Sequence, residues 1–397
     1  MVLTRLVVNQ GKYVFAQINS LVVRYEFDKC VNRYQGNYKV RGFSCWNQFL
    51  CMMFGQLTHR ESIRDIATCL KAHQNKVYHL GIKQAISHST ITRANENRDW
   101  RIYADYAKHL IDIVRPMYAA DKEFSEDLDN TIYALDSTTI DLCLSVFPWA
   151  RFRKHKAAVK LHTLLDLRGN IPVFVDITDG KVHDVNTLDL IDFEPGAIYV
   201  MDKAYTDFAR LFDMEMHQAY FVIRGKDNLR FRHVNSTRVD KSVGLKCDQI
   251  IKLTGINTSR RYPKKLRRIK YRDPETDLLL VFLTNNFDIK AEDVCILYKN
   301  RWQIELFFKW IKQHLRIKAF WGYSPNAVKT QIWIAICTYL LVAYAKKTLG
   351  SELSLYEITQ IIGVSIFDKT PMSELLTSFS KSERIKENYN QLNMFDL

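Results

Sequence analysis

Three acidic residues stand in segments whose other side chains are mostly apolar. Asp136 and Asp202 each follow a short apolar run, YAL before the first and YVM before the second. Glu305 lies in residues 298–314, YKNRWQIELFFKWIKQH, among rings and aliphatic side chains. A carboxylate buried in such surroundings is costly unless it is paired or holds a metal ion. Three carboxylates that converge without a Cys or His partner suit Mg²⁺, for which Mn²⁺ could substitute.

The segment 298–314 predicts a helix with one narrow polar face. At about 100° per residue, its polar residues fall within a stripe roughly 60° wide: Tyr298, Arg301, Glu305 and Lys312. Apolar residues cover almost all of the remaining circumference, which is typical of a helix packed nearly all round with its polar stripe facing a cleft. The stripe could instead be an ordinary ladder of ion pairs along a helix.

Carboxylates at the ends of buried strands could carry phosphodiester chemistry. Such strand ends border the crevice where α/β proteins bind ligands, so Asp136 and Asp202 would converge there. Two divalent ions held roughly 3.5–4 Å apart can activate an attacking oxygen and stabilise the leaving one. Either aspartate could alternatively be a turn or capping residue, and three others compete for the role: Asp166, Asp176 and Asp179.

The positive charge of the chain is concentrated in one segment. The whole sequence has a formal net charge of +14 at pH 7. Residues 224–272 contain sixteen Lys and Arg against three Asp, which accounts for nearly all of the excess. This surplus, interleaved with aromatic residues, favours a nucleic-acid partner over a solvated basic face or a membrane-surface patch. In its densest part, the residues expected to contact DNA are Arg260, Arg261, Lys264, Lys265, Arg267 and Arg268.

The cysteines and the apolar runs predict a protein of the reducing cytosol. The eight cysteines form no CxxC pair and no Cys/His metal spacing, so reduced thiols are expected. The first residues, MVLTRLVVNQGKY, lack the apolar core and cleavage site of a secretory signal. The longest uncharged run, residues 332–345, is too short to span a bilayer and predicts a buried helix.

The first 120 or so residues predict helices. Thr58 and Glu61 have the spacing of a capping box at a helix start, and a second helix could begin at Ser87 or Ser89 after a break near Gly81. Two short helices, the second of them basic, could dock on DNA as a helix-turn-helix or belong to a plain helical bundle. The residues that would face DNA are Arg93, Asn95 and Arg98.

From residue 131 the pattern changes to that of a mixed α/β core. Apolar, β-branched runs of strand length lie at residues 131–136, 157–167, 170–179 and 197–202, with a short helix expected at 183–192. The elements expected after these are a strand at 219–225, a mainly β basic segment, a strand at 278–286 and helices at about 290–318 and 326–348.

These residues resemble the pattern of the IS4-family (DDE) insertion-sequence transposases. The Y-(2)-R-(3)-E-(6)-K signature of that family is matched at full spacing by the four residues of the polar stripe. Asp136, in LDST, matches the first aspartate of the family, and Asp202, in MDKAY, matches the second. The resemblance covers roughly residues 130–345, and the helical N-terminal part also resembles that of one branch of these transposases.

The resemblance implies an α/β fold, with an RNase H-like catalytic core that carries a β-rich insertion and follows a helical N-terminal domain. The implied domains are a DNA-binding domain at 1–125, the catalytic domain at 126–348 with its basic insertion at about 226–277, and a tail at 349–397 that could dimerise. The implied function is cut-and-paste DNA transposition by metal-dependent hydrolysis and strand transfer.

The resemblance also assigns roles to single residues. The implied catalytic residues and Mg²⁺ ligands are Asp136, Asp202 and Glu305. The implied contacts with DNA phosphates are Tyr298, Arg301 and Lys312. The expected partners are double-stranded DNA, at the element ends and the target, and a second copy of the chain on that DNA. The expected location is the bacterial cytoplasm, at the nucleoid.

Further residues near these motifs have two readings each. Lys203 and Tyr205 could position the DNA strand or simply cover the sheet edge. Asp184 could cap a helix or belong to the site, and His162 is more typical of a core histidine than of a ligand. The basic segment 148–156 could bind DNA or form a solvated hairpin.

The insertion departs from relatives that cut DNA through a hairpin intermediate. Those relatives stack a flipped base on a tryptophan of the insertion, and no tryptophan falls in it here. Phe231, Tyr262 or Tyr271 could serve instead, because any ring can stack a base. The alternatives to a transposase are a DNA-binding regulator without catalysis and a nuclease that never joins strands.

Overall fold

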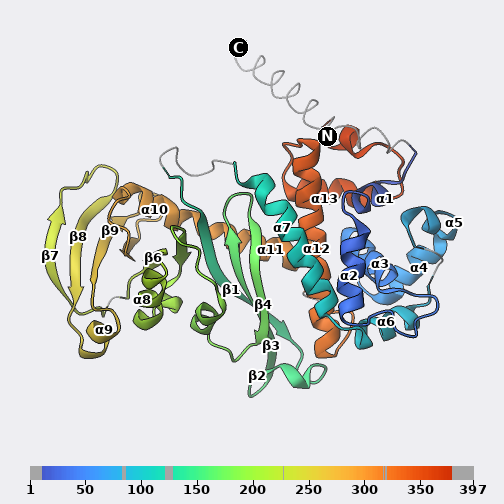
Figure 1. Ribbon diagram of the computed structural model, residues 1–397, viewed down its shortest axis with the longest axis horizontal. Coiled ribbons are helices and arrows are strands. Elements are labelled where there is room, and N and C mark those ends of the chain that lie inside the picture. Colours follow the sequence, from blue (N-terminus) through green and yellow to red (C-terminus); the bar gives the residue numbers. More distant parts are fainter. Residues whose placement is uncertain are drawn as a thin grey trace, which may run out of the picture. The chain divides into compact units, whose positions relative to one another are not determined.

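The computed structural model describes residues 11–82, 86–120, 128–226, 228–315, 317 and 320–377 (Figure 1). The chain divides into two compact units. The helical unit comprises the described residues of Met1–Met117 and Lys309–Leu397, and the sheet unit comprises those of Tyr118–Phe308. This division differs from the expected catalytic domain at 126–348, because the segment after Phe308 belongs with the N-terminal helices.

The helical unit is organised around α12, Pro325–Leu349, which contacts α1, α3, α6 and α13. By length and composition α12 could cross a membrane, but 83% of its most apolar window is buried inside the structure. The buried helix expected at 326–348 is therefore confirmed. The other helices are α1 (Val14–Asn19), α2 (Arg24–Arg33), α3 (Cys45–Leu57), α4 (Ile63–Ala72), α5 (Gln74–Val77), η2 (Tyr78–Leu80), α6 (His88–Asn97), α7 (Arg101–Tyr118) and α13 (Leu355–Val364).

Of the two helix starts expected in the N-terminal region, one is confirmed and the other is wrong. Ser87 caps α6 by accepting a hydrogen bond from the backbone N–H of Thr90, as one of the two expected starts requires. Thr58, expected to open a helix with Glu61, instead ends α3. The next helix, α4, is capped by Ser62, whose hydroxyl is better placed to accept from its first turn.

Two of the three α6 residues expected to face DNA are instead held inside the helical unit. Asn95 is fully buried. The guanidinium of Arg98 donates to the backbone carbonyls of Phe43 and Ser44, so it ties α6 to the start of α3. Of the three residues expected to face DNA, Arg93 alone is exposed. The packing of α6 is that of a helical bundle.

The sheet unit contains a ten-stranded sheet in the order β2-β3-β1-β5-β6-β10-β9-β8-β7, with β4 paired to β3. β1, β5 and β6 are parallel neighbours, and β7 to β9, which form the basic segment, extend the same sheet through β10. The bounds are β1 (Ile132–Leu142), β2 (Arg151–Arg153), β3 (Lys156–Asp166), β4 (Ile171–Asp179), β5 (Ile198–Met201), β6 (Tyr220–Arg224), β7 (Phe231–Thr237), β8 (Leu245–Leu253), β9 (Lys265–Arg272) and β10 (Leu279–Thr284).

β1 is longer than expected, so Asp136 lies within the strand and not at its end. The parallel pairing of β1 with β5 stops at Leu135, opposite Met201. From Asp136 to Leu142, β1 pairs only with β3. Asp136 is therefore the first residue of β1 beyond its parallel neighbour, which places it where the crevice of an α/β sheet begins.

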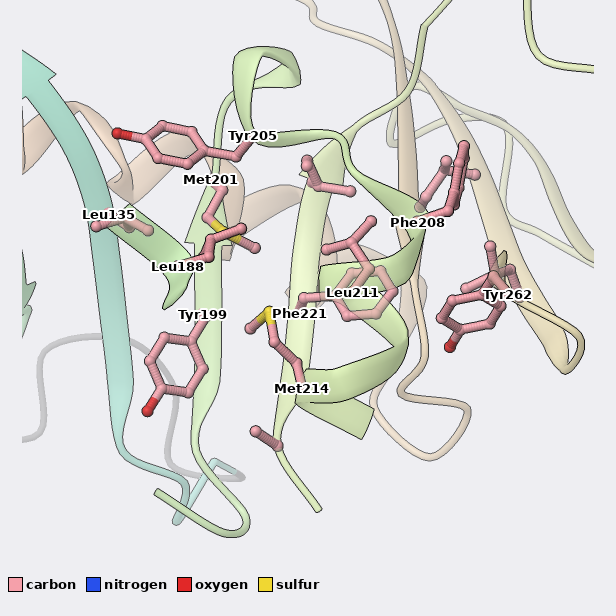
Figure 2. Close-up of a cluster of buried hydrophobic side chains, with 14 of the residues drawn as sticks. Leu135, Leu188, Tyr199, Met201, Tyr205, Phe208, Leu211, Met214, Phe221 and Tyr262 are labelled. Atoms are coloured by element: carbon pink, nitrogen blue, oxygen red, sulfur yellow. The ribbon is translucent and has the colours of Figure 1, made fainter. Parts of the chain in front are cut away.

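A cluster of buried side chains packs α8, Phe208–Met216, on one face of this sheet. Figure 2 shows Leu211 and Met214 of α8 beside Phe221 of β6. On the same face lie Leu135 and Met201. Successive side chains of a strand point to opposite faces, so Asp136 points away from this cluster.

Two helices replace the single helix expected at about 290–318: α10 (Ala291–Asn300) and α11 (Trp302–His314). The N–H of Arg301 donates to the carbonyl of Tyr298 at 3.2 Å, and the N–H of Ile304 donates to the carbonyl of Arg301 at 3.1 Å. These bonds span three residues, a tighter winding than in an α-helix. The polar stripe of the sequence is therefore interrupted at Arg301.

Candidate active site

Two parallel strands bring Asp136 and Asp202 side by side. The register pairs Leu135 of β1 with Met201 of β5, and the next residue along each strand is one of the two aspartates. Asp202 then leads into the short turn η5, Lys203–Tyr205. Competing Asp166 is buried and paired with Arg168.

Arg301 links the first aspartate to the glutamate. One guanidinium nitrogen of Arg301 donates to Asp136 Oδ2 at 2.8 Å, and the other donates to Glu305 Oε1 at 2.7 Å. The short turn between α10 and α11 makes this possible, since it holds Arg301 over the strand while Glu305 follows one helical turn later. The fork of an arginine suits such a double contact with carboxylates.

Tyr298 completes the group from the last turn of α10. Its hydroxyl donates to Asp202 Oδ1 at 3.2 Å. Burial raises the pKa of Tyr298, so it remains a neutral hydroxyl donor at pH 7. The sheet unit thus brings together Asp136, Asp202, Glu305, Tyr298 and Arg301. Lys312, the last residue of the signature, lies further along α11, within the helical unit.

The charges of this group are unbalanced. Burial raises the pKa of Asp136; Arg301 counteracts this effect, and the neighbouring carboxylates add to it. Burial disfavours the charged form of Arg301, yet Asp136 and Glu305 leave its pKa raised. Three carboxylates against one guanidinium therefore favour the binding of a further cation.

The ligand chemistry fits a hard divalent cation, because all three candidate ligands are carboxylates. Within the described residues, no group of three Asp, Glu, His or Cys side chains is close enough to hold an ion together. Arg301 gives a physical reason, since its guanidinium takes one oxygen of Asp136 and one of Glu305. Arg301 occupies the place of a cation between them.

The first turn of α11 is more exposed than the sequence pattern predicts. The side chain of Glu305 is 57% exposed, so it is not the buried carboxylate expected. Trp302 and Leu306 are 49% and 38% exposed, so the apolar arc is not covered all round. The reason is the turn at Arg301, which separates the faces of α10 and α11.

A largely apolar cavity of about 460 Å³ opens beside the group. It lies between α10 and the strands β8, β9 and β10, and its rings come from Tyr271, Phe282, Tyr298 and Trp302. Tyr271 was one of three rings expected to replace the missing tryptophan of the insertion. Trp302 was overlooked because it stands outside the insertion, in the signature segment itself.

The other two rings proposed for base stacking are less accessible. Tyr262 is fully buried, and its hydroxyl donates to Glu215, so it serves the core (Figure 2). Phe231 is partly covered by Arg268, whose guanidinium lies 5.1 Å from the ring centre. Tyr262 is therefore a residue of the core, and the expectation that it could stack a base is wrong.

The basic segment divides into exposed cations and one buried ion pair. Arg267 is 7% exposed and pairs with Asp248 at 2.7 Å, which removes it from the candidate DNA contacts. Arg268 is half-buried and donates to Gln249. The remaining candidates are exposed: Arg260, Arg261, Lys264 and Lys265.

The two candidate residues after Asp202 also differ in exposure. Lys203 is exposed at η5 and stays available to DNA. Tyr205 is 1% exposed and packs in the core cluster, so it does not reach a bound strand (Figure 2). The basic segment 148–156 forms the turn η3, Pro148–Ala150, and the edge strand β2.

A polar network lies behind the site, on the face of β1 opposite Asp136. Ser137 Oγ and Lys160 Nζ donate to the same oxygen of Asp184, at 2.6 and 3.0 Å. His162 lies beside them, fully buried, and burial lowers its pKa. Asp184 is the first residue of η4, Asp184–Leu190, and accepts from Ser137 of β1 and Lys160 of β3. It therefore links η4 to the part of β1 that lies beyond the parallel neighbour β5.

Comparisons with known proteins show which family the chain is similar to. The family described as "Transposase DDE domain" matches residues 127–341, more than half of the chain, and a domain of unknown function (DUF4372) matches residues 10–83. The putative transposase y4zB of Sinorhizobium fredii is 31% identical over 245 residues, 61% of this chain and 68% of that protein.

A second relative is the probable transposase for insertion sequence element IS5377 of Geobacillus stearothermophilus, 31% identical over 212 residues. That match spans 53% of this chain and 55% of that protein. The solved piggyBac transposase synaptic complex with hairpin DNA is 11% identical, with a TM-score of 0.42, over 97% of this chain and 84% of that one. The extent of the DDE match and the relation to y4zB show that the chain belongs to the DDE transposase family.

Proposed function

We propose that this DDE transposase moves an insertion sequence by cut-and-paste transposition, with Asp136, Asp202 and Glu305 as its catalytic residues. The observation that carries the proposal is the register of β1 and β5, which sets the two aspartates side by side, while Arg301 links Glu305 to Asp136. A group of three carboxylates near one another, with a single guanidinium to pair with two of them, is a candidate functional site.

The three carboxylates would hold Mg²⁺, or Mn²⁺ in its place. When bound, such ions stabilise charge on the attacking and leaving oxygens of a phosphodiester. The carboxylates of the chain fix where the reacting phosphate sits. Water attacks a phosphodiester at the element end and breaks its bond to the 3′ oxygen, which leaves a 3′-OH and a 5′-phosphate. That 3′-OH later attacks a phosphodiester of the target DNA, so that a new phosphodiester forms and the 3′ oxygen of the target strand leaves. No bond between protein and DNA is needed.

Arg301 has a second partner in this scheme. When cations and DNA enter, its guanidinium can leave the two carboxylates and donate to a DNA phosphate, for which its fork is equally suited. The hydroxyl of Tyr298 can likewise leave Asp202 and donate to a phosphate oxygen instead. Lys312 completes the proposed phosphate contacts of the signature, and Lys203 adds one beside Asp202.

The cavity beside Tyr298 supports a step in which one base leaves the duplex. Tyr271 and Trp302 offer rings that such a base could stack on, and the cavity has the size of a small-ligand pocket. A base held there would keep the cut end open for hairpin formation and reopening. This assigns to two rings the part that a tryptophan of the insertion plays in relatives.

The proposed partners follow from the reaction. Element ends and target DNA are the double-stranded substrates, and two copies of the chain would hold the two ends. The proposed place of action is the cytoplasm, at the nucleoid, where that DNA lies. A DNA-binding regulator would have no use for the carboxylate group, and a plain nuclease would leave no joined product.

The decisive experiment replaces Asp202 by Asn and measures cutting of a labelled duplex that carries the inverted repeat flanking the gene. With Mg²⁺ present, we expect cutting to fall by at least about a hundredfold, while DNA binding remains. Asp141→Asn is the matched control, because Asp141 is an exposed aspartate of β1 away from the group. Cutting by the Asp202 variant would refute the assignment, and cut ends never joined to a target plasmid would favour the nuclease.

A further inference from the structure

A second cavity, here called the strand-end pocket, lies at the carboxyl ends of the parallel strands. It measures about 340 Å³. One wall is the segment after β5, residues 206–208, and another is the segment after β6, residues 226 and 228–230. The third wall is α9, Ile256–Arg261, with the glycine before it. Ligands of α/β sheets bind outside these strand ends, the same edge that carries Asp202.

The polar lining of the strand-end pocket is suited to an anion. Lys226, Arg230 and Arg261 reach it from different segments of the chain. Within the described part of the chain, the side chains of Lys226 and Arg230 make no ion pair or hydrogen bond. Arg261 has only a distant partner, Asp207 Oδ2 at 3.9 Å. Two cations with no described partner and a third with only a distant one give the lining a surplus of positive charge, which suits a phosphate.

Two amides give the strand-end pocket a second chemistry. Asn228 and Asn257 line it, and the structure describes no hydrogen bond of either side chain. An amide can donate and accept at once, which matches the edge of a base. Phe208, largely buried at the start of α8, supplies an apolar surface (Figure 2). The pocket thus offers partners for phosphate and for base.

The start of α8 does not itself supply the anion site. Asp207 accepts hydrogen bonds from the backbone N–H groups of Ala209 and Arg210, so these donors are already used. Asp207 also sits near Arg210, at 3.4 Å. The attraction for an anion therefore rests on the side chains of the other two walls.

The pocket is close enough to the catalytic group to share one DNA strand with it. Thr206, in the pocket wall, stands four positions after Asp202, so their Cα atoms are no more than about 14 Å apart. Successive nucleotides of a strand rise by about 3.4 Å in duplex DNA. A strand cut at Asp202 would reach the pocket within about four nucleotides.

We infer that the strand-end pocket binds one unpaired nucleotide of the DNA strand that is cut, with its phosphate on Lys226, Arg230 and Arg261 and its base on Asn228 and Asn257. This rests on the proposed function, which supplies the strand. The pocket would set which phosphodiester reaches the carboxylates, because it holds the strand a few nucleotides away.

The test compares binding of a blunt duplex and of the same duplex with a four-nucleotide single-stranded extension, by fluorescence anisotropy in EDTA. For Lys226→Gln with Arg230→Gln, we expect the salt slope of binding the extended DNA to fall by up to about one, because the pocket neutralises a single phosphate. The control is Arg238→Gln with Lys241→Gln, which removes two exposed cations of the same basic segment. It should leave the difference between the two DNAs unchanged.

A second variant tests the base contact. Asn257→Ala changes no charge, and we expect it to weaken binding of the extended DNA by about tenfold and to spare the blunt duplex. The inference would be overturned if the two double variants lowered the salt slope for the extended DNA equally. It would also be overturned if Asn257→Ala weakened binding of the extended and the blunt DNA equally. Binding in EDTA is independent of cutting, so failure of the Asp202→Asn experiment would be recognised separately.

Discussion

Arg301 is the residue on which the state of the site depends. It forms ion pairs with both Asp136 and Glu305, with a side chain that is only 16% exposed. A guanidinium in that place competes with a divalent cation for the same oxygens. Binding of DNA would resolve the competition, because a phosphate gives Arg301 another partner as the cations enter.

Replacing Arg301 by Ala should therefore have two opposite effects. We expect a lower half-saturating Mg²⁺ concentration for cutting, since the competing cation is gone, and weaker DNA binding, with a salt slope smaller by about one. Titrations of cutting rate with Mg²⁺ and anisotropy at several salt concentrations measure both. Arg210→Ala is the control, because Arg210 forms an ion pair with Asp189 elsewhere in the sheet unit. An unchanged Mg²⁺ requirement would contradict the competition.

At the scale of elements, the strands were predictable and the exact limits of the helices were not. β5 and β6 match their predicted runs because apolar β-branched runs bounded by polar residues leave little choice of structure. Asp136 was expected at a strand end, but the hairpin with β3 continues β1 beyond its neighbour β5. Pairing of this kind depends on distant residues, which a local pattern does not contain.

The carboxylates and the cavities were predictable to different degrees. Asp136, Asp202 and Glu305 stood out by type, spacing and resemblance. The burial of Arg267 and Tyr262 could not be predicted from the local pattern. It depends on their partners, Asp248 for Arg267 and Glu215 for Tyr262, which lie elsewhere in the sequence. The strand-end pocket was invisible for the same reason, since its walls come from three separate segments.

The break between α10 and α11 has a consequence for DNA that can be measured. It leaves Trp302 about half exposed at the cavity shared with Tyr271. If a base enters that cavity, Trp302→Ala should lower hairpin formation by about tenfold, the loss of one stacking partner, and leave the first cut unchanged. Denaturing gels separate nicked from hairpin products. Trp149→Ala serves as a control outside the cavity, and equal loss of nick and hairpin would argue against base stacking.

At the scale of the whole molecule, one chain carries one group of the proposed catalytic carboxylates within its described residues, whereas excision of an element requires cuts at two ends. The basic segment can attract DNA but cannot by itself hold two ends in one site. We therefore predict that two copies of the chain meet on the DNA, and that their association depends on end DNA. Sedimentation of the protein with a duplex carrying one inverted repeat should give a complex of two chains and two duplexes, while a scrambled duplex of equal length should not. Full excision of both ends by a complex with a single chain would show that one catalytic group serves the two ends in turn.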